Sequence, residues 1–433
     1  MLKNIKILIS SRFPKFGVNK LQTVTRLIYE ISKRDHTSPE QILQNIPITY
    51  TNFEGVKSLL LKQRFPNCTN EERANIKVFP SFLNNQQTKV DLTYKKLLID
   101  PKEFLVEKIV ANSALVEKIK KLYPHTPLQI INSYNDHIKT EEFSIAKYNR
   151  RIDRIFIVKE NFDFISPCPC TKDCVCCGYQ ILNCGMGCGF ECEYCYLQSY
   201  TNAPGIAIPA NIDDYLQKLG EIKHPIRIGT GQFTDSLLFD NITGYSKIII
   251  PFLADKPHIQ FEFKTKSVNI QNLLECKASP NIITAWSLNP QIIIDNCEHF
   301  TASLTERLSA AKQCQDHGYK IAFHFDPIIY FKNWEQKYAG VINQIFKNIK
   351  PENIAWISLG TLRMTIKQKQ TIESRFPNNT ILDEEFINGF DNKLRYNDRI
   401  REKLYQSLSK QIHTHGKNIN VYLCMENKEL QKI

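Results

Sequence analysis

From about residue 179 onward the sequence alternates between predicted strands and predicted helices, and no other pattern in the chain limits the fold so strongly. Segments rich in β-branched and aromatic residues predict strands at 179–183, 226–228, 259–263, 282–287, 320–325 and 354–359. Segments with helical periodicity lie between them, for example 211–219, 304–317 and 334–348. Such alternation favours a parallel sheet covered by helices, so we predict an α/β fold in a full or partial barrel.

The chain before residue 179 follows other patterns. A small α/β unit is predicted from a strand at 96–99, a helix at 103–121 and a strand at 128–131, followed by a polar loop at 132–147. We therefore expect five parts: a basic, mostly helical extension (1–90), a small α/β domain (91–150), a cysteine-rich lead-in (151–178), the barrel (179–390), and a C-terminal helix and strand (391–433).

Length and composition exclude several classes of protein. Hydrophobic residues make up 42% of the 433 residues, which predicts a packed core rather than disorder. No apolar run approaches the roughly 20 residues that span a bilayer. The apolar stretch at the N-terminus is too short for a secretory signal. We expect a cytoplasmic protein without a membrane segment.

The positive charge is concentrated at one end of the chain. Of the net charge of +12, residues 1–90 contribute +8, because they hold 14 Lys and Arg against 6 Asp and Glu. Clustered Lys and Arg suit a polyanion such as a nucleic acid. A basic surface that is merely solvated remains the alternative.

Cysteines give the strongest chemical signal. The chain has 14 cysteines, and nine of them lie between Cys168 and Cys195. Within this stretch Cys188, Cys192 and Cys195 have the spacing C-x3-C-x2-C. Three thiolates can hold three irons of a [4Fe–4S] cubane and leave the fourth iron open to a small ligand. The motif follows the first predicted barrel strand, at the end where such barrels keep their sites. A zinc site completed by Cys184 is the alternative.

This motif after a first strand resembles the signature of the radical S-adenosylmethionine superfamily, whose fold is a partial (β/α)6 barrel. The run from Cys192 to Gln198 is similar, more narrowly, to the spore photoproduct lyase family. The similarity continues in Phe263–Lys266, in Trp286–Asn289, in the pair Arg395-Tyr396, and upstream in residues 155–164.

The resemblance implies a function and a set of site residues. A [4Fe–4S] cluster would cleave S-adenosylmethionine, and the 5′-deoxyadenosyl radical would take hydrogen from a damaged thymine in DNA, with an electron donor of the flavodoxin or ferredoxin type. The cluster ligands would be Cys188, Cys192 and Cys195. The cofactor-binding residues would be Tyr194, Gly229, Thr230, Lys266, Ser287 and Asn289. The catalytic residues would be Tyr196, as a hydrogen relay, Arg395 and Tyr396. Asp326 is added to them because it ends the fifth predicted strand, at the same barrel mouth as the cluster.

One position departs from the family pattern. The lyases carry a hydrogen-donor cysteine three residues before an aspartate that matches Asp235, whereas this chain has Gln232 there. An amide N–H bond is too strong to quench a carbon radical. We therefore expect a changed last step or a different substrate; Tyr196, Cys176 or Cys177 could serve only if the fold brings them close.

Two further features allow more than one interpretation. The cysteines of 168–177 could hold a second metal, supply a hydrogen donor, or have no role. His324 and Asp326 end a predicted strand, and we expect alternation to turn one of them inward. Asp326 would then bind adenosine or substrate, or else cap the following segment.

Three functions therefore compete at this point. The first is a radical enzyme acting on a damaged base in DNA. The second is a radical enzyme acting on RNA or a peptide. The third is a non-catalytic zinc or iron–sulfur protein that binds nucleic acid.

Overall fold

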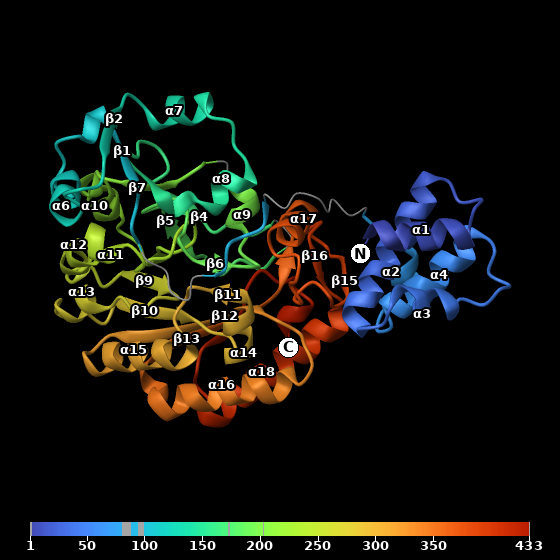
Figure 1. Cartoon of the computed structure of the whole chain (residues 1–433). Coiled ribbons are helices and arrows are strands. Elements are labelled where there is room, and N and C mark those ends of the chain that lie inside the picture. Colours follow the sequence, from blue (N-terminus) through green and yellow to red (C-terminus); the bar gives the residue numbers. More distant parts are fainter. Residues whose placement is uncertain (1, 80–87, 94–98, 172–173, 202, 433) are drawn as a thin grey trace.

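The computed structural model describes residues 2–79, 88–93, 99–171, 174–201 and 203–432. Figure 1 shows three bodies: a group of N-terminal helices, a small parallel sheet, and a large sheet with helices on its outer face. Within the described residues no helix is both long and apolar enough to cross a membrane.

The large sheet has eight strands in the order β17-β13-β12-β10-β9-β8-β5-β4. Six of them are parallel neighbours in chain order: β5 (Gln180–Leu182), β8 (Ile226–Gly229), β9 (Ile259–Thr265), β10 (Ile282–Ser287), β12 (Lys320–Ile328) and β13 (Ile354–Thr361). At its edges, β17 (Val421–Leu423) pairs parallel with β13, and β4 (Ile165–Pro167) pairs antiparallel with β5. All six predicted barrel strands are confirmed.

Polar contacts inside the sheet show that it curls into a partial barrel. Arg227 of β8 donates from Nη2 to the hydroxyl of Tyr422 on β17, at 3.0 Å. The same guanidinium carbon lies 4.1 Å from the ring centroid of Trp356 on β13. Side chains from the two halves of the sheet therefore meet across its concave face.

The expectation that only one of His324 and Asp326 turns inward is wrong. His324 Nε2 lies 2.7 Å from Glu262 Oε1 and its Nδ1 lies 2.6 Å from Ser358 Oγ, on the strands either side of the β10–β12 pair. Asp326 lines the cavity at the barrel mouth. Residues two apart on a strand share a face, so His324 and Asp326 lie one above the other inside the barrel.

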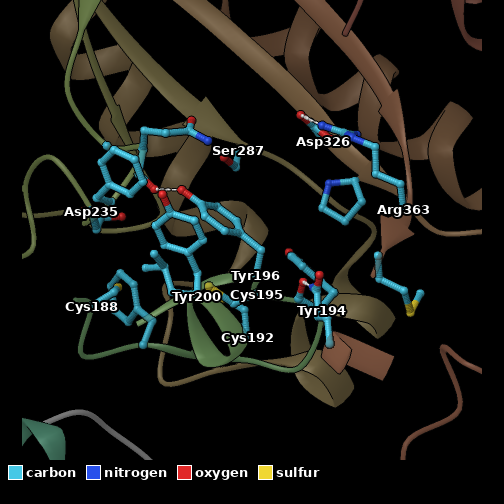
Figure 2. Close-up of a pocket in the computed structure, with 18 of the residues that line it drawn as sticks. Cys188, Cys192, Tyr194, Cys195, Tyr196, Tyr200, Asp235, Ser287, Asp326 and Arg363 are labelled. Atoms are coloured by element: carbon cyan, nitrogen blue, oxygen red, sulfur yellow. Dashed lines mark hydrogen bonds and ion pairs between the residues drawn. The ribbon is translucent and has the colours of Figure 1, made fainter. Parts of the chain in front are cut away.

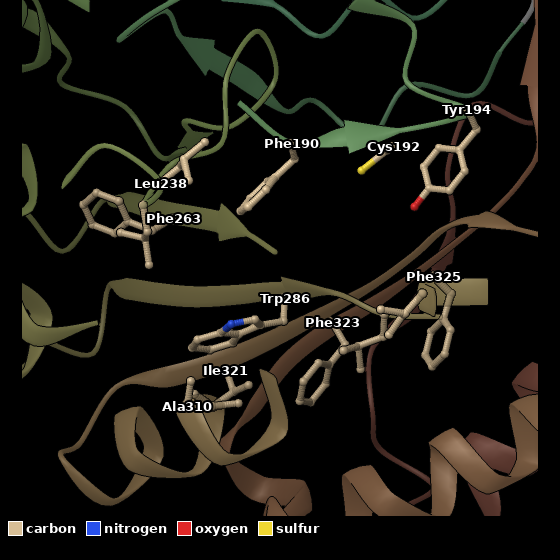
Figure 3. Close-up of a cluster of buried hydrophobic side chains, with 14 of the residues drawn as sticks. Phe190, Cys192, Tyr194, Leu238, Phe263, Trp286, Ala310, Ile321, Phe323 and Phe325 are labelled. Carbon is tan, nitrogen blue, oxygen red and sulfur yellow. The ribbon is translucent and has the colours of Figure 1, made fainter. Parts of the chain in front are cut away.

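Amphipathic helices cover the convex face. They include α10 (Ile212–Glu221), α12 (Tyr245–Leu253), α15 (Leu304–Asp316), α16 (Trp334–Asn348) and α18 (Asp398–His415). Figure 3 shows the resulting core, in which Trp286 and Ile321 of the sheet face Ala310 of α15. Complete burial of such side chains stabilises the barrel by roughly 1.5–3 kcal/mol each.

The small sheet is parallel throughout and has the order β2-β1-β3-β7. Its strands are β1 (Glu103–Glu107), β2 (Leu128–Ile131), β3 (Arg154–Val158) and β7 (Ile206–Pro209). The helix predicted at 103–121 is wrong in its first part, because the residues of β1 pair with both neighbouring strands, and the helix proper is α6 (Ala114–Leu122).

Two other predictions for this region have different outcomes. The polar segment expected to be a loop forms α7 (Tyr134–Thr140) and α8 (Ile145–Asn149), each begun by a serine whose hydroxyl accepts a backbone N–H. The strand predicted at 96–99 falls largely on 94–98, outside the described residues.

The N-terminal body has its own hydrophobic core, built on α1 (Leu2–Arg12), α2 (Val18–Asp35), α3 (Pro39–Gln44), α4 (Phe53–Arg64) and α5 (Asn70–Ala74). Buried ion pairs attach it to α17 (Ile366–Arg375): Arg26 contacts Glu373, and Lys369 Nζ lies 2.8 Å from Glu30 Oε1. The boundaries expected between the five parts stay predictions.

Candidate active site

A cavity of about 410 Å³ opens at the carboxyl ends of the barrel strands. The three cysteines of the C-x3-C-x2-C motif line one end, and charged side chains from the ends of β9, β12 and β13 line the other. Figure 2 shows Cys188, Cys192 and Cys195 below Tyr196 and Tyr200, with Asp326 and Arg363 across the cavity.

A buried carboxylate fixes the loop that carries the cysteines. Glu191 accepts hydrogen bonds from Arg151 Nη1 and from Arg375 Nη2, the latter at 2.6 Å. Arg151 also donates to the backbone oxygens of Cys188, at 2.6 Å, and Phe190, at 2.7 Å. The loop is held further because β6 (Glu191–Cys192) pairs antiparallel with β11 (Glu298–His299). The three thiols therefore project from a rigid support.

The donor set fits an iron–sulfur cluster better than a single zinc ion. Burial, with the charge of Asp235, raises the pKa of Cys188 to about 12, and burial also raises the pKa of Cys192 and Cys195. A bound cluster releases such protons. Over the described parts of the chain, no three His, Cys, Asp or Glu side chains gather closely enough to hold one metal ion. Cys184 lies at a separate, smaller cavity, so it does not complete a zinc site here.

Asp235 joins the loop after β8 to the end of β9. Its Oδ1 accepts from the hydroxyl of Thr265 at 2.6 Å, and its Oδ2 accepts from the backbone N–H of Lys266 at 2.8 Å. Burial acts to lower the pKa of Lys266, but the negative charges of Cys192 and Glu298 raise it above its ordinary value. Lys266 therefore stays protonated and lines the cavity between the cysteines and β9.

A glycine lets the loop after β8 approach β9 closely. Gly231 lines the cavity with φ +88°, and a Cβ there would lie 2.6 Å from the backbone oxygen of Lys264. Only glycine combines this left-handed conformation with so close a contact.

Tyr194 is fixed by a network behind the cavity. Its hydroxyl donates to Glu298, and Asn289 Nδ2 donates to the same carboxylate at 2.9 Å. Arg307 binds the other carboxylate oxygen at 2.6 Å and donates to the backbone oxygen of Ser287 at 2.8 Å. Burial opposes ionisation, but Arg307 and Lys266 hold the pKa of Glu298 at about 2.

Tyr196 and Tyr200 form the wall above the cysteines. The Tyr196 hydroxyl donates to the backbone oxygen of Gln232 at 2.5 Å. Tyr200 stacks on Phe233 with ring centroids 5.7 Å apart and is 64% exposed, so its ring is open to a planar ligand at the mouth.

Asp326 faces the cysteines from the far wall. Arg363 binds it with both terminal nitrogens, Nη1 to Oδ1 at 2.9 Å and Nη2 to Oδ2 at 3.2 Å. Burial acts against ionisation, yet the Arg363 charge lowers the pKa of Asp326. The pair is therefore ionised and partly open to the cavity.

The structure brings together most, but not all, of the residues predicted from sequence. The cavity is lined by Cys188, Cys192, Cys195, Tyr194, Tyr196, Lys266, Ser287 and Asp326. Gly229, Thr230, Asn289, Arg395 and Tyr396 lie behind its wall. Their assigned roles stay predictions.

The residues behind the wall have internal partners. Thr230 donates to Ser236 Oγ at 2.6 Å, and Gly229 packs against Tyr179. Arg395 binds Asp391 Oδ2 at 2.8 Å, and the Tyr396 hydroxyl accepts from the backbone N–H of Tyr330 at 3.1 Å.

The sequence interpretation missed three basic residues that line the cavity: Lys264, Arg363 and Lys393. Lys264 could have been found, because it lies at the end of β9, two residues before Lys266, and alternation along the chain directs both side chains to the same side. No sequence pattern around Glu298 indicated that its carboxylate would hold the Tyr194 hydroxyl.

The second metal expected at Cys168–Cys177 is not supported. Each of these cysteines lies within the described residues, yet they bring no third donor close enough to share an ion. All 14 cysteines of the chain are free thiols.

Comparison with known proteins gives consistent matches. A sequence profile described as spore photoproduct lyase matches residues 171–422. The spore photoproduct lyase of Clostridium acetobutylicum is 29% identical over 206 residues, which cover 46% of this chain and 61% of the relative. The chain thus spans about three fifths of the length of that curated relative.

Two solved structures share the fold. One is a spore photoproduct lyase complexed with dinucleoside spore photoproduct, with a TM-score of 0.64 and 21% identity over 75% of this chain and 99% of the other. The second is a mutant lyase with bound AdoMet and dinucleoside spore photoproduct, with a TM-score of 0.63, 21% identity and the same coverage.

These likenesses confirm the predicted partial barrel. The profile match covers the cysteine loop, the six parallel strands from β5 to β13, and Asp326, Arg363 and Lys393 of the cavity lining. The chain belongs to the spore photoproduct lyase family.

Proposed function

We propose that this chain is a radical S-adenosylmethionine enzyme of the spore photoproduct lyase type that acts on a damaged thymine in DNA. The observation that carries the proposal is the placing of three thiols, Cys188, Cys192 and Cys195, at one end of a cavity whose other wall is basic. These thiols would hold a [4Fe–4S] cluster with one open iron.

When bound, the cluster supplies the electron that cleaves S-adenosylmethionine into methionine and the 5′-deoxyadenosyl radical. The protein supplies position and shielding. Lys266, a half-buried positive charge on the cavity wall, would pair with the methionine carboxylate, and Ser287 would offer a hydroxyl on the same wall. Asp235 fixes Lys266 through the backbone bond at 2.8 Å.

Aromatic side chains of the cavity wall would exclude water. Tyr194 is buried and fixed by Glu298, and Phe190 closes the cavity beside the cysteines. A radical formed in such a site is kept from solvent.

Basic residues in two places, the cavity and the N-terminal body, support a polyanionic substrate. Lys264, Arg363 and Lys393 line the cavity. On the N-terminal body, Lys6, Arg12, Lys15 and Lys20 are exposed, and no acidic residue precedes Glu30. Phosphates favour such surfaces. Tyr200, stacked on Phe233, would receive a base at the mouth.

Two residues face the substrate in this proposal. Tyr196 would relay a hydrogen atom, because its hydroxyl lies on the cavity wall and is held by Gln232. Asp326, oriented by Arg363, would accept a hydrogen bond from a base N–H. Arg395 would act from behind: it donates to the backbone oxygen of Met425 at 3.1 Å, and Met425 lines the cavity. Tyr396 lies beside it on the same strand.

The chemistry also implies a partner and a compartment. The reducing electron would come from a flavodoxin or ferredoxin type of carrier. Thiolate ligands need a reducing compartment, so we place the protein in the cytoplasm.

The test uses protein reconstituted anaerobically with iron and sulfide and supplied with reduced flavodoxin. S-adenosylmethionine and dinucleoside spore photoproduct are added, with undamaged thymidine dinucleotide, an RNA oligonucleotide and a peptide as parallel substrates. We expect conversion of the lesion alone, lost in Cys192→Ala and kept in Cys297→Ala. Cys297 is an equally buried cysteine of α14 (Gln291–Cys297) that does not line the cavity. Turnover of RNA or peptide instead of the lesion would contradict the proposed substrate.

A further inference from the structure

Positive side chains gather on the N-terminal body, where α1 ends and α2 and α4 begin. The Arg12 guanidinium carbon lies 5.8 Å from the ring centroid of Phe13, and Lys20 Nζ lies 5.6 Å from that of Phe53. Lys57 Nζ lies 5.9 Å from the same Phe53 centroid. Two lysines therefore share one aromatic ring, and the arginine lies at a second ring.

The aromatic rings form a continuous strip beneath these charges. Phe13 stacks on Phe16 with ring centroids 4.9 Å apart, and Phe16 meets Phe53 edge-on at 5.8 Å. Phe13 and Phe16 are buried in the core of the body, so the strip is a fixed support. Lys15 is exposed between them in the chain. The cationic side chains on or beside the strip make up what we call the basic patch: Arg12, Lys15, Lys20 and Lys57.

The basic patch stays positive after its acidic neighbour is counted. Glu54 Oε2 lies 4.0 Å from Lys57 Nζ, but the Glu54 side chain is 79% exposed, so solvent and salt screen its charge. The sequence has no acidic residue before Glu30. Helix α2 begins at Val18, within the patch, and the positive end of its dipole adds to the charge. A surface of this kind attracts phosphates.

Buried contacts fix the body that carries the patch to the wall of the cavity. Helix α17 lies between them: Gln368 lines the cavity, while the next residue, Lys369, binds Glu30 of α2 at 2.8 Å. Arg64 of α4 donates to the backbone oxygen of Glu384 at 2.8 Å. Figure 1 shows the N-terminal helices beside α17. The basic patch therefore has a fixed place relative to the cavity.

A duplex whose lesion occupies the cavity would be long enough to reach the patch. A helix such as α17 is about 10–12 Å wide. Along α2, Lys20 precedes Arg26, which contacts Glu373 of α17, by about 9 Å. One turn of duplex DNA is about 34–36 Å long, more than these two lengths together. A dinucleoside, at roughly 3.4 Å per nucleotide, is too short to reach both sites.

We propose that the basic patch binds the phosphate backbone of duplex DNA beside the lesion. The proposal rests on the proposed function, because the cavity must hold the lesion of the same duplex. Duplex DNA carries one charge per about 1.7 Å, twice the density of one strand, which suits a rigid cluster of cations. The N-terminal body precedes residues 171–422, which match the family profile, so the patch lies outside the part that identifies the family.

The test variant removes three charges of the patch and leaves the buried residues of the body in place. It is Lys15→Gln/Lys20→Gln/Lys57→Gln. Arg12 is kept, because its Nη2 also donates to the backbone oxygen of Ile46 at 2.7 Å. A second variant, Lys15→Arg/Lys20→Arg/Lys57→Arg, retains the charge and should bind DNA as the wild type does.

A matched control removes the same number of charges elsewhere. Lys218, Lys312 and Lys347 are exposed on α10, α15 and α16, the helices of the convex face of the barrel. The control variant is Lys218→Gln/Lys312→Gln/Lys347→Gln. It has the same net charge as the test variant, so the two differ only in where the charges were lost.

The first readout is DNA binding by cluster-free protein, which needs no turnover. Fluorescence anisotropy of a labelled duplex of about two turns, roughly 20 base pairs, is followed over a series of salt concentrations. In the test variant the slope of log K against log salt should fall by about 3, and Kd should rise about tenfold or more. The control variant should keep the wild-type slope.

Three results of the binding experiment would overturn the proposal. The first is an unchanged slope and Kd in the test variant. The second is an equal loss of affinity in the control variant, since total charge would then explain the binding. The third is a larger loss of affinity for single-stranded DNA or duplex RNA of the same length, because the patch would then serve another nucleic acid.

The second readout compares two substrates of the reconstituted enzyme, a duplex that carries the lesion and dinucleoside spore photoproduct. The ratio of their kcat/KM values should fall about tenfold in the test variant and stay constant in the control. A constant ratio in the test variant would refute the role of the patch and leave the proposed function intact. Failure of every protein to convert either substrate would refute the proposed function, and the patch's role in repair with it.

Discussion

Substitution by glutamine should change the stability of the fold very differently at two glutamates of the cysteine loop. Glu191 and Glu193 are both buried, at 5% and 4% exposure, and lie two residues apart. Burial acts to raise the pKa of Glu191, but Arg151 and Arg375 lower it. For Glu193, burial prevails and the pKa is raised. Glu191 is thus a carboxylate paired with two arginines, whereas burial disfavours the ionised form of Glu193.

The size of the stability loss depends on which contacts each glutamine substitution would break. In Glu191→Gln one guanidinium keeps an acceptor, while the other faces an amide NH2 in a buried site. Breaking a buried ion pair from one side costs about 3–5 kcal/mol. Glu193 has one contact, from Oε1 to His299 Nε2 at 3.3 Å, and its other oxygen has no hydrogen bond. Glu193→Gln should therefore cost less than about 1 kcal/mol.

Urea unfolding of cluster-free protein, followed by tryptophan fluorescence, measures this difference. Trp286, Trp334 and Trp356 are all buried in the barrel and its helices, so they report on the barrel. With an m-value of about 3 kcal/mol/M, the midpoint for Glu191→Gln should fall by about 1–1.7 M. Equal midpoints for the two variants, or a loss below about 1 kcal/mol for Glu191→Gln, would refute the reasoning.

Three further predictions concern the ligands, the pH dependence and one tight contact. Cys192→Ala should lower the iron content after reconstitution from about four atoms per chain, measured by chelator absorbance. Glu298 has a pKa of about 2, below its unfolded value. The stabilisation of the fold by ionised Glu298 is therefore complete above the pKa of the unfolded state and is lost as the pH falls toward the pKa of the folded state. Glu298→Gln should remove roughly 1–2 kcal/mol of the stability lost between pH 6 and pH 3, seen in urea midpoints at the two pH values. Gly229→Ala would place a Cβ 2.3 Å from the Tyr179 hydroxyl and should cost about 1–3 kcal/mol. The helical control Gly220→Ala, with no atom nearer than 3.5 Å, should not destabilise the fold in thermal unfolding.

The sequence predicted the barrel well because its strands are short, apolar and separated by helices of clear periodicity. Every predicted barrel strand is present, and the cysteine motif lies at the strand end where it was expected. In the barrel the local sequence pattern and the tertiary structure agree, because parallel strands that are buried on both faces consist mainly of apolar residues.

Prediction failed where the local signal and the tertiary contacts disagree. Glu103–Glu107 follows the helical pattern of the segment after it, yet it forms β1 because strands pair on both sides. The second metal was inferred from cysteine spacing alone, and spacing does not show how far apart the thiols lie in space.

Contacts between side chains that meet only in the folded structure could not be predicted either. Glu298 and Arg307 are nine residues apart in the chain, but their pairing with Tyr194 depends on β6 and β11 meeting. No single-strand pattern carries that information.

The central claim is that the three thiols generate a radical from S-adenosylmethionine. The most direct measurement is the amount of 5′-deoxyadenosine and methionine formed by anaerobically reconstituted protein with reduced flavodoxin. We predict equal amounts of both products, depending on Cys188, Cys192 and Cys195 and unaffected by Cys297→Ala. An iron-loaded protein with a cubane electron paramagnetic resonance signal that forms no 5′-deoxyadenosine would contradict the account.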